Sequence, residues 1–139
     1  MKLLGLDWGS KRIGIAISTN STGIALPLRT LSRTSWTNDV STIKNIIETH
    51  NVSMIIIGLP LLLSGKLGQQ ALDIKNAVTN LQTEIEIPIN LFDERLTTQQ
   101  SYKILKETQT KNSKIDEKID EVSACLILQS YIDSNHHEV

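Results

Sequence analysis

Two short apolar segments near the N-terminus constrain the fold more than any other feature of this chain. Residues 2–7 and 12–18 predict two strands, and the short Gly/Ser/Lys link between them predicts an antiparallel hairpin. The first strand ends in Asp7, so its carboxylate is expected at the rim of a sheet, where a ligand can reach it. Gly9 follows, and its backbone freedom allows a phosphate or a metal ion to approach the main chain.

Hydrophobic periodicity predicts the remaining elements. A continuous apolar run at 53–58 predicts a central parallel strand, because such strands are covered on both faces. Pro27 predicts an edge position for its strand, and Asn38 or Thr37 is the expected N-cap of the first helix. The predicted ranges are strands 24–30, 53–58 and 85–92 and helices 39–50, 68–83 and 116–133, with a further helix beginning at 97.

The order βββαβαβα predicts an α/β domain built on a five-stranded mixed sheet. Right-handed crossovers favour the first strand at the centre, in the order 3-2-1-4-5, with helices on both faces. Sites in such sheets form beyond the carboxyl ends of the parallel strands. Asp7 and Glu94 end two of these strands and the last helix carries Asp120, so we expect the three acids to face one groove.

Composition bounds the class of protein. With 139 residues the chain has the size of one domain, 1–139, in which we expect the tail from Ser134 to be frayed and disordered. The single cysteine, Cys125, excludes an internal disulfide and suits a reducing cytoplasm, and no apolar run is long enough to span a bilayer. The net charge of -1 argues against an indiscriminate nucleic-acid binder but is compatible with a nuclease.

Four separate motifs carry a resemblance to a known family. In chain order they are Gly5-x-Asp7-x-Gly9-x-Lys11-Arg12-Ile13-Gly14-x-Ala16, Gly58-Leu59-Pro60 with Gly65 and Gly68, Asp93-Glu94-Arg95-Leu96-Thr97-Thr98, and Asp120 followed by Ala124 and Ile127-Leu128-Gln129-x-Tyr131. Together they resemble the YqgF (RuvX) family over nearly the whole chain. The resemblance implies an RNase H-like fold and a nuclease that processes the 5′ end of pre-16S ribosomal RNA in ribosome biogenesis, or a Holliday junction resolvase.

Three positions depart from the family pattern. Thr19 stands where an Asp usually follows the second strand, Leu61 to Leu63 replace a usually polar loop, and Ser123 replaces a common Ala of the last helix. None of these positions belongs to the three acids. Thr19 argues against a role for an extra carboxylate near the second strand.

The acids Asp7, Glu94 and Asp120 have the chemistry of a metal-dependent nuclease. Phosphodiester hydrolysis needs an activated water and a stabilised leaving oxygen, and two divalent ions about 3.5–4 Å apart supply both. The expected cofactor is Mg²⁺ or Mn²⁺, because such ions accept oxygen ligands. Without a cation, three nearby anions raise one another's pKa values.

Each acid also has an alternative interpretation. Asp7 could cap a turn. Glu94 could form a surface ion pair while Asp93 binds the metal, because successive strand residues point in opposite directions. Asp120 lies in an acidic helix start, which is common for dipole reasons, so the residues alone leave its role open and the resemblance favours the catalytic one.

Phosphate contacts are expected from cations and from glycines that precede a helix. Lys11 could instead be a solvated residue of the hairpin turn, and Arg95 could instead hold Asp93 in place. The glycines could instead serve only to shape the loop. The candidates are Lys11, Arg12, Arg95, Gly65 and Gly68.

Trp8 follows the first acid directly. Its ring could stack on a base of a bound nucleic acid. Packing beneath the groove is the favoured interpretation.

Two nuclease functions share this chemistry. Processing of precursor rRNA is favoured over cutting of a four-way DNA junction, because a net charge of -1 is poor for gripping four duplex arms. A resolvase should act as a dimer, and the chain offers no decisive dimer face, so we expect a monomer or weak homodimer. The expected partner is pre-rRNA, or alternatively branched DNA, with no membrane.

Two alternatives belong to other classes of protein. One is a noncatalytic nucleic-acid-binding or ribosome-assembly module, which the full acid set argues against. The other is an actin-like kinase, whose Gly-x-Asp-x-Gly-Ser hairpin cradles nucleotide phosphates. Such kinases are built from two domains of this kind, and this chain has the length of one.

Overall fold

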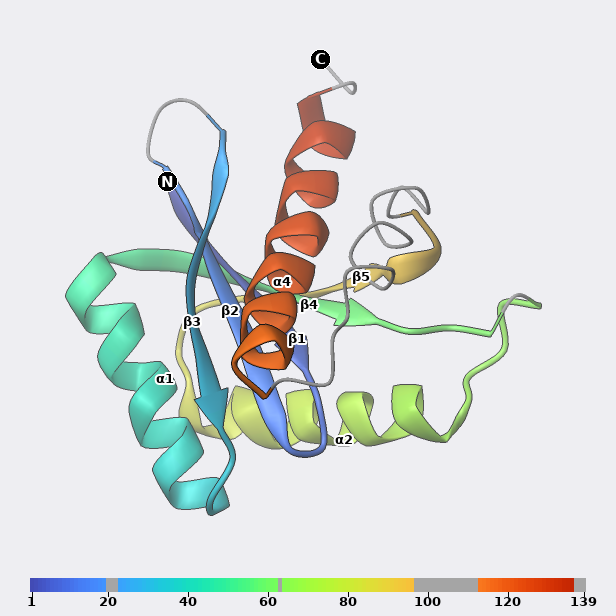
Figure 1. Cartoon of the computed structure of the whole chain (residues 1–139), viewed down its shortest axis with the longest axis horizontal. Helices are drawn as coiled ribbons and strands as arrows, with labels where there is room; N and C mark the ends of the chain where they lie inside the picture. The colour runs from blue at the N-terminus through green and yellow to red at the C-terminus, as the bar shows by residue number, and fades with distance from the viewer. Residues whose placement is uncertain (20–22, 63, 97–112, 137–139) are drawn as a thin grey trace.

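The computed structural model describes residues 1–19, 23–62, 64–96 and 113–136 (Figure 1). The elements are β1 (Lys2–Trp8), β2 (Arg12–Ser18), β3 (Ala25–Ser32), α1 (Trp36–His50), β4 (Val52–Leu59), α2 (Gln69–Glu84), β5 (Ile89–Asp93), the 3-10 turn η1 (Glu94–Leu96) and α4 (Ser113–His136). The helix predicted to begin at 97 lies outside the described residues. No helix in the described part of the chain is long and apolar enough to cross a membrane.

The five strands form one mixed sheet in the order β3-β2-β1-β4-β5, which confirms the predicted arrangement. β1 lies at the centre, antiparallel to β2 and parallel to β4, and β5 extends the sheet parallel to β4. β3 is an edge strand, as Pro27 predicts, and its ladder with β2 is irregular between Ile15 and Ala16, the partner of that proline.

Each face of the sheet has its own core, because alternate side chains of a strand point to opposite faces. Leu4, Leu6 and Trp8 of β1 pack on the face covered by α1 and α2. Leu3 packs on the other face against α4, which crosses in front of the strands in Figure 1. Residues 55–57 of β4 are fully buried on both faces, which confirms the predicted central strand. Burial of each such side chain contributes about 1.5–3 kcal/mol.

The start of α1 differs from the prediction. Ser35 is the N-cap, and its hydroxyl accepts a hydrogen bond from the backbone N–H of Asn38 at 3.2 Å. The predicted caps, Thr37 and Asn38, were wrong, because both residues already lie in the helix.

β5 and α4 also differ in length from their predicted ranges. β5 begins at Ile89 rather than at 85, because Pro88 has no N–H to donate to the ladder and only its carbonyl bonds Ile55 of β4, at 2.9 Å. α4 extends beyond the predicted 116–133 at both ends. It includes residues 134–136, and the fraying predicted from Ser134 stays a prediction.

Candidate active site

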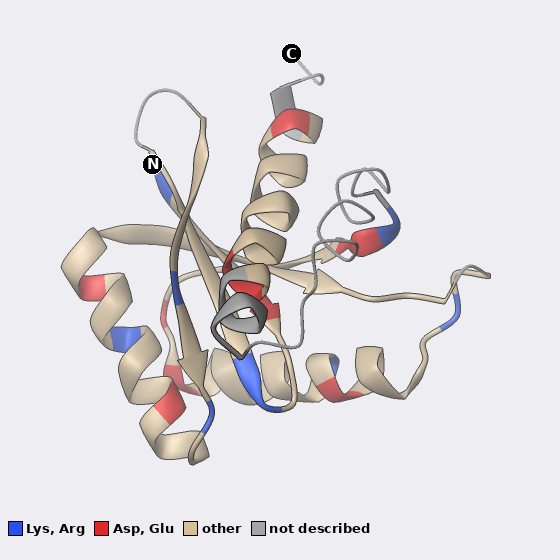
Figure 2. Cartoon of the chain, viewed as in Figure 1, with Lys and Arg blue, Asp and Glu red and all other residues tan. Residues whose placement is uncertain are grey.

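Two strands and a helix bring three acidic residues to one end of the sheet. Asp7 lies one residue before the end of β1, Glu94 directly follows β5, and Asp120 lies on α4. Charge interactions link Asp7 with both Asp120 and Glu94. Figure 2 shows acidic residues gathered where α4 crosses the strands. The structure therefore brings together the three acids that the sequence singled out.

Glycines on both sides of Asp7 create the space for the other two acids. Gly14 lies opposite Asp7 on β2, and a Cβ at Gly14 would overlap the backbone carbonyl of Asp120. Gly58 lies on β4, the other neighbour of β1, and a Cβ there would lie 2.5 Å from Glu94 Oε1. Side chains at these two positions would push α4 and Glu94 away from Asp7. The sequence showed both glycines only as motif members, and this role was missed.

Burial raises the pKa values of two of the acids. Burial raises the pKa of Asp7 to about 6, and the negative charge of Asp120 adds to this effect. Burial also raises the pKa of Glu94 to about 7, with further contributions from the charges of Asp7 and Asp93. Strongly shifted pKa values in one place are typical of functional sites. Because Asp7 and Glu94 interact, their protons leave in coupled steps.

Arg12 holds Asp120. Its Nε donates to Asp120 Oδ2 at 2.6 Å, and the pair joins the start of β2 to α4. Both side chains are partly shielded from water, and charge-assisted hydrogen bonds are stronger than neutral ones. The cation predicted to bind phosphate is thus engaged with one of the three acids, and its phosphate contact remains a prediction.

Asp93 and Arg95 form a separate ion pair. Arg95 Nη2 lies 2.7 Å from Asp93 Oδ2, and the Arg95 backbone N–H donates to Asp93 Oδ1 at 2.9 Å. The side-chain hydrogen bond from Arg95 lowers the pKa of Asp93, opposite in direction to the shift of Glu94. Asp93 is therefore bonded to Arg95. This agrees with the alternative interpretation of Arg95, in which it holds Asp93. This arrangement favours Glu94 over Asp93 as the third acid.

The remaining phosphate-binding candidates lie outside the acid cluster. Lys11 is exposed in the hairpin link, and its side chain has no ion pair within the described ranges. Gly65 has a φ of 85°, a conformation that favours glycine, and a Cβ there would lie 3.3 Å from Arg95 Nη1. Gly68 is the N-cap of α2, without a side-chain hydrogen bond. Phosphate contacts of these residues remain predictions.

The acids suit a divalent cation by their chemistry. Mg²⁺ and Mn²⁺ take carboxylate oxygens, and buried acids that repel one another are relieved by a positive charge. Over the described residues, no group of three or more acidic, histidine or cysteine side chains is arranged to hold a single ion. The Asp120 carboxylate bonds Arg12 instead. A metal-binding role of Asp7 and Glu94, with Asp120 beside them, remains a prediction.

Arg33 anchors the hairpin that carries Asp7, and sequence reasoning missed it. Its Nη1 donates to the Gly9 carbonyl at 3.1 Å, and its Nε lies 3.4 Å from Oδ2 of the buried Asp39. The guanidinium carbon lies 5.1 Å from the centre of the Trp8 ring. Trp8 itself is only 6% exposed, which confirms the interpretation that it packs in the core. No local sequence pattern links residues 33 and 39 to the hairpin.

Comparison with known proteins decides the family. A family model described as "RuvX: Holliday junction resolvase" matches residues 1–134. The chain belongs to the RuvX family. A protein of Thermoanaerobacter pseudethanolicus is 43% identical, covering 99% of this chain and 100% of the relative. A protein of Syntrophus aciditrophicus is 38% identical, covering 99% and 92%. Both carry the name "Putative pre-16S rRNA nuclease".

Solved structures share the fold of this RuvX-family chain. Thermus thermophilus RuvC in complex with a Holliday junction substrate has a TM-score of 0.62 at 10% identity, covering 99% of this chain and 96% of that one. Fowlpox virus resolvase with Holliday junction DNA has a TM-score of 0.55 at 16% identity, covering 97% and 99%. These likenesses confirm the RNase H-like fold. The family assignment makes the chain a nuclease, an endonuclease among the hydrolases.

Proposed function

We propose that this RuvX-family chain is a metal-dependent endonuclease that processes the 5′ end of pre-16S rRNA. One observation carries the proposal: Asp7 and Glu94 are partly buried, with pKa values raised to about 6 and about 7, beside Asp120. Acids in this setting destabilise a fold at neutral pH unless a cation accompanies them. Such a cation site at the carboxyl ends of strands suits phosphodiester hydrolysis.

Asp7, Glu94 and Asp120 would hold the divalent ions, Mg²⁺ or Mn²⁺. When bound, a pair of such ions stabilises charge on the attacking and leaving oxygens of the phosphate. Asp7 is fixed by the central strand, and Glu94 would have to give up its carboxyl proton to hold a cation, since its pKa is raised to about 7. Arg12 keeps the carboxylate of Asp120 oriented from the hairpin.

The substrate assignment is supported by the names of the relatives and by charge. Relatives that match nearly the whole chain are named for pre-16S rRNA. The net charge of -1 favours a local contact with RNA over a grip on four duplex arms. We place this activity in the cytoplasm, where the free thiol of Cys125 is compatible with a reducing environment.

Resolution of a four-way DNA junction is the second candidate function. The description of the family model favours it. Symmetric cutting of two strands requires two active sites, so this function predicts a homodimer, whereas rRNA processing is compatible with a monomer or a weak homodimer.

A paired cleavage assay tests the proposal. Wild-type protein and the Asp7→Asn variant are incubated with an end-labelled pre-16S leader RNA and with a synthetic four-way junction, each with Mg²⁺, Mn²⁺ or chelator. We expect metal-dependent cutting of the RNA that is lost in Asp7→Asn. Symmetric cutting of the junction alone would move the assignment to resolvase. Binding of both substrates without cutting would replace the proposal with a noncatalytic binding module.

A further inference from the structure

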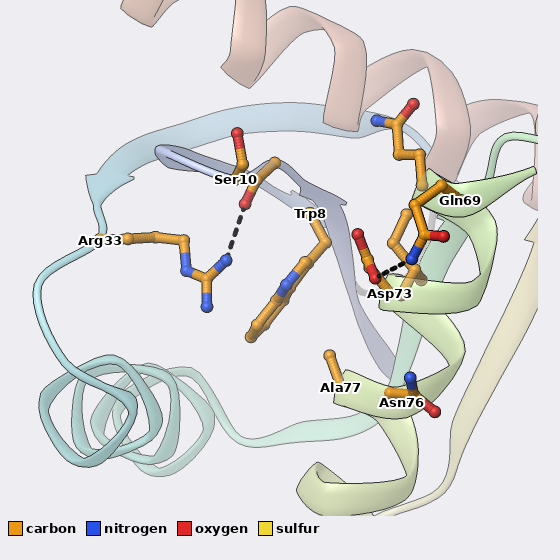
Figure 3. A pocket seen from close by; sticks show the side chains of 10 residues that line it. Trp8, Ser10, Arg33, Gln69, Asp73, Asn76 and Ala77 are labelled. Atoms are coloured by element: carbon orange, nitrogen blue, oxygen red, sulfur yellow. Dashed lines mark hydrogen bonds between the residues drawn. The ribbon is translucent and has the colours of Figure 1, made fainter.

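A pocket of about 590 Å³ lies beside the hairpin that carries Asp7 (Figure 3). Trp8, Gly9 and Ser10 of the hairpin line one side, Arg33 lines another, and the first turns of α2 close the third. Trp8 follows Asp7 in β1, so the two side chains point to opposite faces of the sheet. The pocket and the acids therefore lie at the same hairpin tip, on opposite faces of the sheet.

The α2 side of the pocket is polar. Gln69, Gln70, Asp73 and Asn76 line it and are exposed to solvent. Gln69 Nε2 donates to Asp73 Oδ1 at 2.9 Å, drawn as a dashed line in Figure 3. Within the described ranges Asp73 Oδ2 has no further partner, so one carboxylate oxygen can accept from a ligand. Amides can both donate and accept, whereas a carboxylate only accepts.

The rest of the lining is preformed. Arg33 is fixed against Trp8 and the Gly9 carbonyl, and it is the one cation that lines this pocket among the described residues. Ile74 and Ala77 of α2 supply apolar surface beside Trp8. A concave site with an apolar floor and a few placed polar groups suits a small planar ligand.

We infer that this pocket binds a nucleobase of the strand that the active site cuts, with guanine preferred. The identity of this ligand rests on the proposed nuclease function. The Watson–Crick edge of guanine presents two adjacent N–H donors, at N1 and N2. Asp73 Oδ2 can accept one of them, and Oδ1, whose bond from Gln69 uses one lone pair, can accept the other. The other three bases lack this pair of donors. Gln70 and Asn76 also line the pocket, and their amides supply both donors and acceptors for the remaining polar groups of the base.

Charge fixes the orientation of the nucleotide. Asp73 repels a phosphate on the α2 side, whereas Arg33 attracts one on the hairpin side. A base that points toward α2 therefore has its phosphate near Ser10, at the tip of the hairpin that carries Asp7. The same strand would then pass over the hairpin tip to reach the acids on the other face of the sheet.

Binding of mononucleotides to the full-length wild-type protein in chelator tests this inference without turnover. The probes are GMP, AMP, CMP, UMP and inorganic phosphate. The readout is the NMR signals of the side-chain amides of Gln69, Gln70 and Asn76 and of the Trp8 indole N–H. We expect saturable shifts of these signals with GMP, and binding about tenfold weaker for the other nucleotides, since a hydrogen bond to a charged group contributes about 1.5–3 kcal/mol.

Two variants and a control separate the pocket from the rest of α2. Asp73→Asn should remove the preference for GMP, and Asn76→Ala should weaken binding of GMP. Asn80→Ala removes an amide from the same helix outside the pocket lining and should bind GMP as the wild type does. Equal shifts with inorganic phosphate alone, or with all four nucleotides, would overturn the guanine assignment.

The cleavage assay then distinguishes the two claims. If the protein cuts RNA while GMP leaves the pocket signals unmoved, the pocket inference fails and the proposed function stands. If GMP moves these signals with the expected preference while neither RNA nor junction is cut, the nuclease proposal fails and the base-binding pocket stands.

Discussion

Gly14 lies directly opposite Asp7 in the antiparallel ladder of β1 and β2. The absence of a side chain at Gly14 lets α4 pass over this position with the backbone of Asp120 against the strand. The closeness of Asp120 to Asp7 contributes to the raised pKa of Asp7. Burial is the larger cause of this shift, and the backbone contact at Gly14 allows the smaller contribution from Asp120.

Gly14→Ala should displace α4 and impair both folding and cleavage. The new Cβ would overlap backbone, which cannot move aside as a flexible side chain can, so we expect a loss of about 1–3 kcal/mol in the free energy of unfolding. Urea denaturation measures this loss. Gly68→Ala is the matched control for stability, because its Cβ would meet only the Leu62 side chain at 3.4 Å, and it should cost less than about 1 kcal/mol. Equal losses in the two variants would refute the role of Gly14.

Glu94→Gln and Asp93→Asn should differ sharply. Glu94→Gln removes a predicted metal ligand, so we expect the cleavage rate to fall by about 100-fold or more. Mutation of residues that only hydrogen-bond to metal ligands already lowers activity by about 10–100-fold. Asp93→Asn weakens a partly exposed ion pair with Arg95 and removes the smallest contribution to the raised pKa of Glu94, so it should change the free energy of unfolding by about 1 kcal/mol at most and leave most of the activity. Cleavage rates with Mg²⁺ measure both effects. The reverse order of losses would make Asp93 the ligand.

Arg12→Gln should shift the pH dependence of cleavage. Without the guanidinium, the charge of Asp120 acts more strongly on Asp7, so the pKa of Asp7 rises and the cleavage rate reaches half its maximum at a higher pH. The pH profile of the rate measures this shift. Arg29→Gln is the control, because Arg29 is an exposed cation of β3 and its loss should leave the profile in place. A raised KM with an unmoved profile would assign Arg12 to phosphate binding instead.

The stability of the metal-free protein should fall as the pH rises through the pKa values of Asp7 and Glu94. The pKa of Asp7 is 3.8 ordinarily and about 6 in the folded chain, so the folded state binds its proton more tightly. This contribution is complete below about pH 4, decreases between about pH 4 and pH 6, and is absent at higher pH. Relative to wild type, Asp7→Asn should therefore gain stability as the pH rises, by about 2–3 kcal/mol, because each pKa unit corresponds to about 1.4 kcal/mol.

Chemical denaturation across this pH range, with chelator and with Mg²⁺, measures the effect. Saturating Mg²⁺ should reduce the loss in the wild type and leave Asp7→Asn unchanged. A difference between the two proteins that stays constant with pH would show that Asp7 ionises normally in the folded chain.

The sheet order was predictable because its determinants are local. Three local features each place one strand: the hairpin link pairs the first two strands, Pro27 marks an edge strand, and the continuous apolar run at 53–58 marks a central one. The preference for right-handed crossovers fixes the remaining order of the strands. Asp7 and Glu94 could be found for the same reason, since each ends a strand whose direction was known. The predicted start of β5 was wrong because alternating isoleucines continue across Pro88, and only the ladder shows where pairing begins.

The supporting contacts were not predictable, because they join distant parts of the chain. Arg12 and Asp120 are 108 positions apart, and neither residue carries a local signal for the other. Gly14 and Gly58 were visible in the motifs, but which atoms approach them depends on the packing of α4 and on the end of β5. The anchoring of the hairpin by Arg33 likewise exists only in the folded chain.

Titration of Mn²⁺ into the metal-free protein, followed by calorimetry in buffers of different ionisation enthalpy, tests the central claim most directly. We expect saturable binding with release of protons near pH 7, because Glu94 has a pKa of about 7 and must be ionised to bind the cation. Asp7→Asn should lose this binding. Absence of binding to the wild type, or equal binding to Asp7→Asn, would contradict the claim that Asp7 and Glu94 form a metal site.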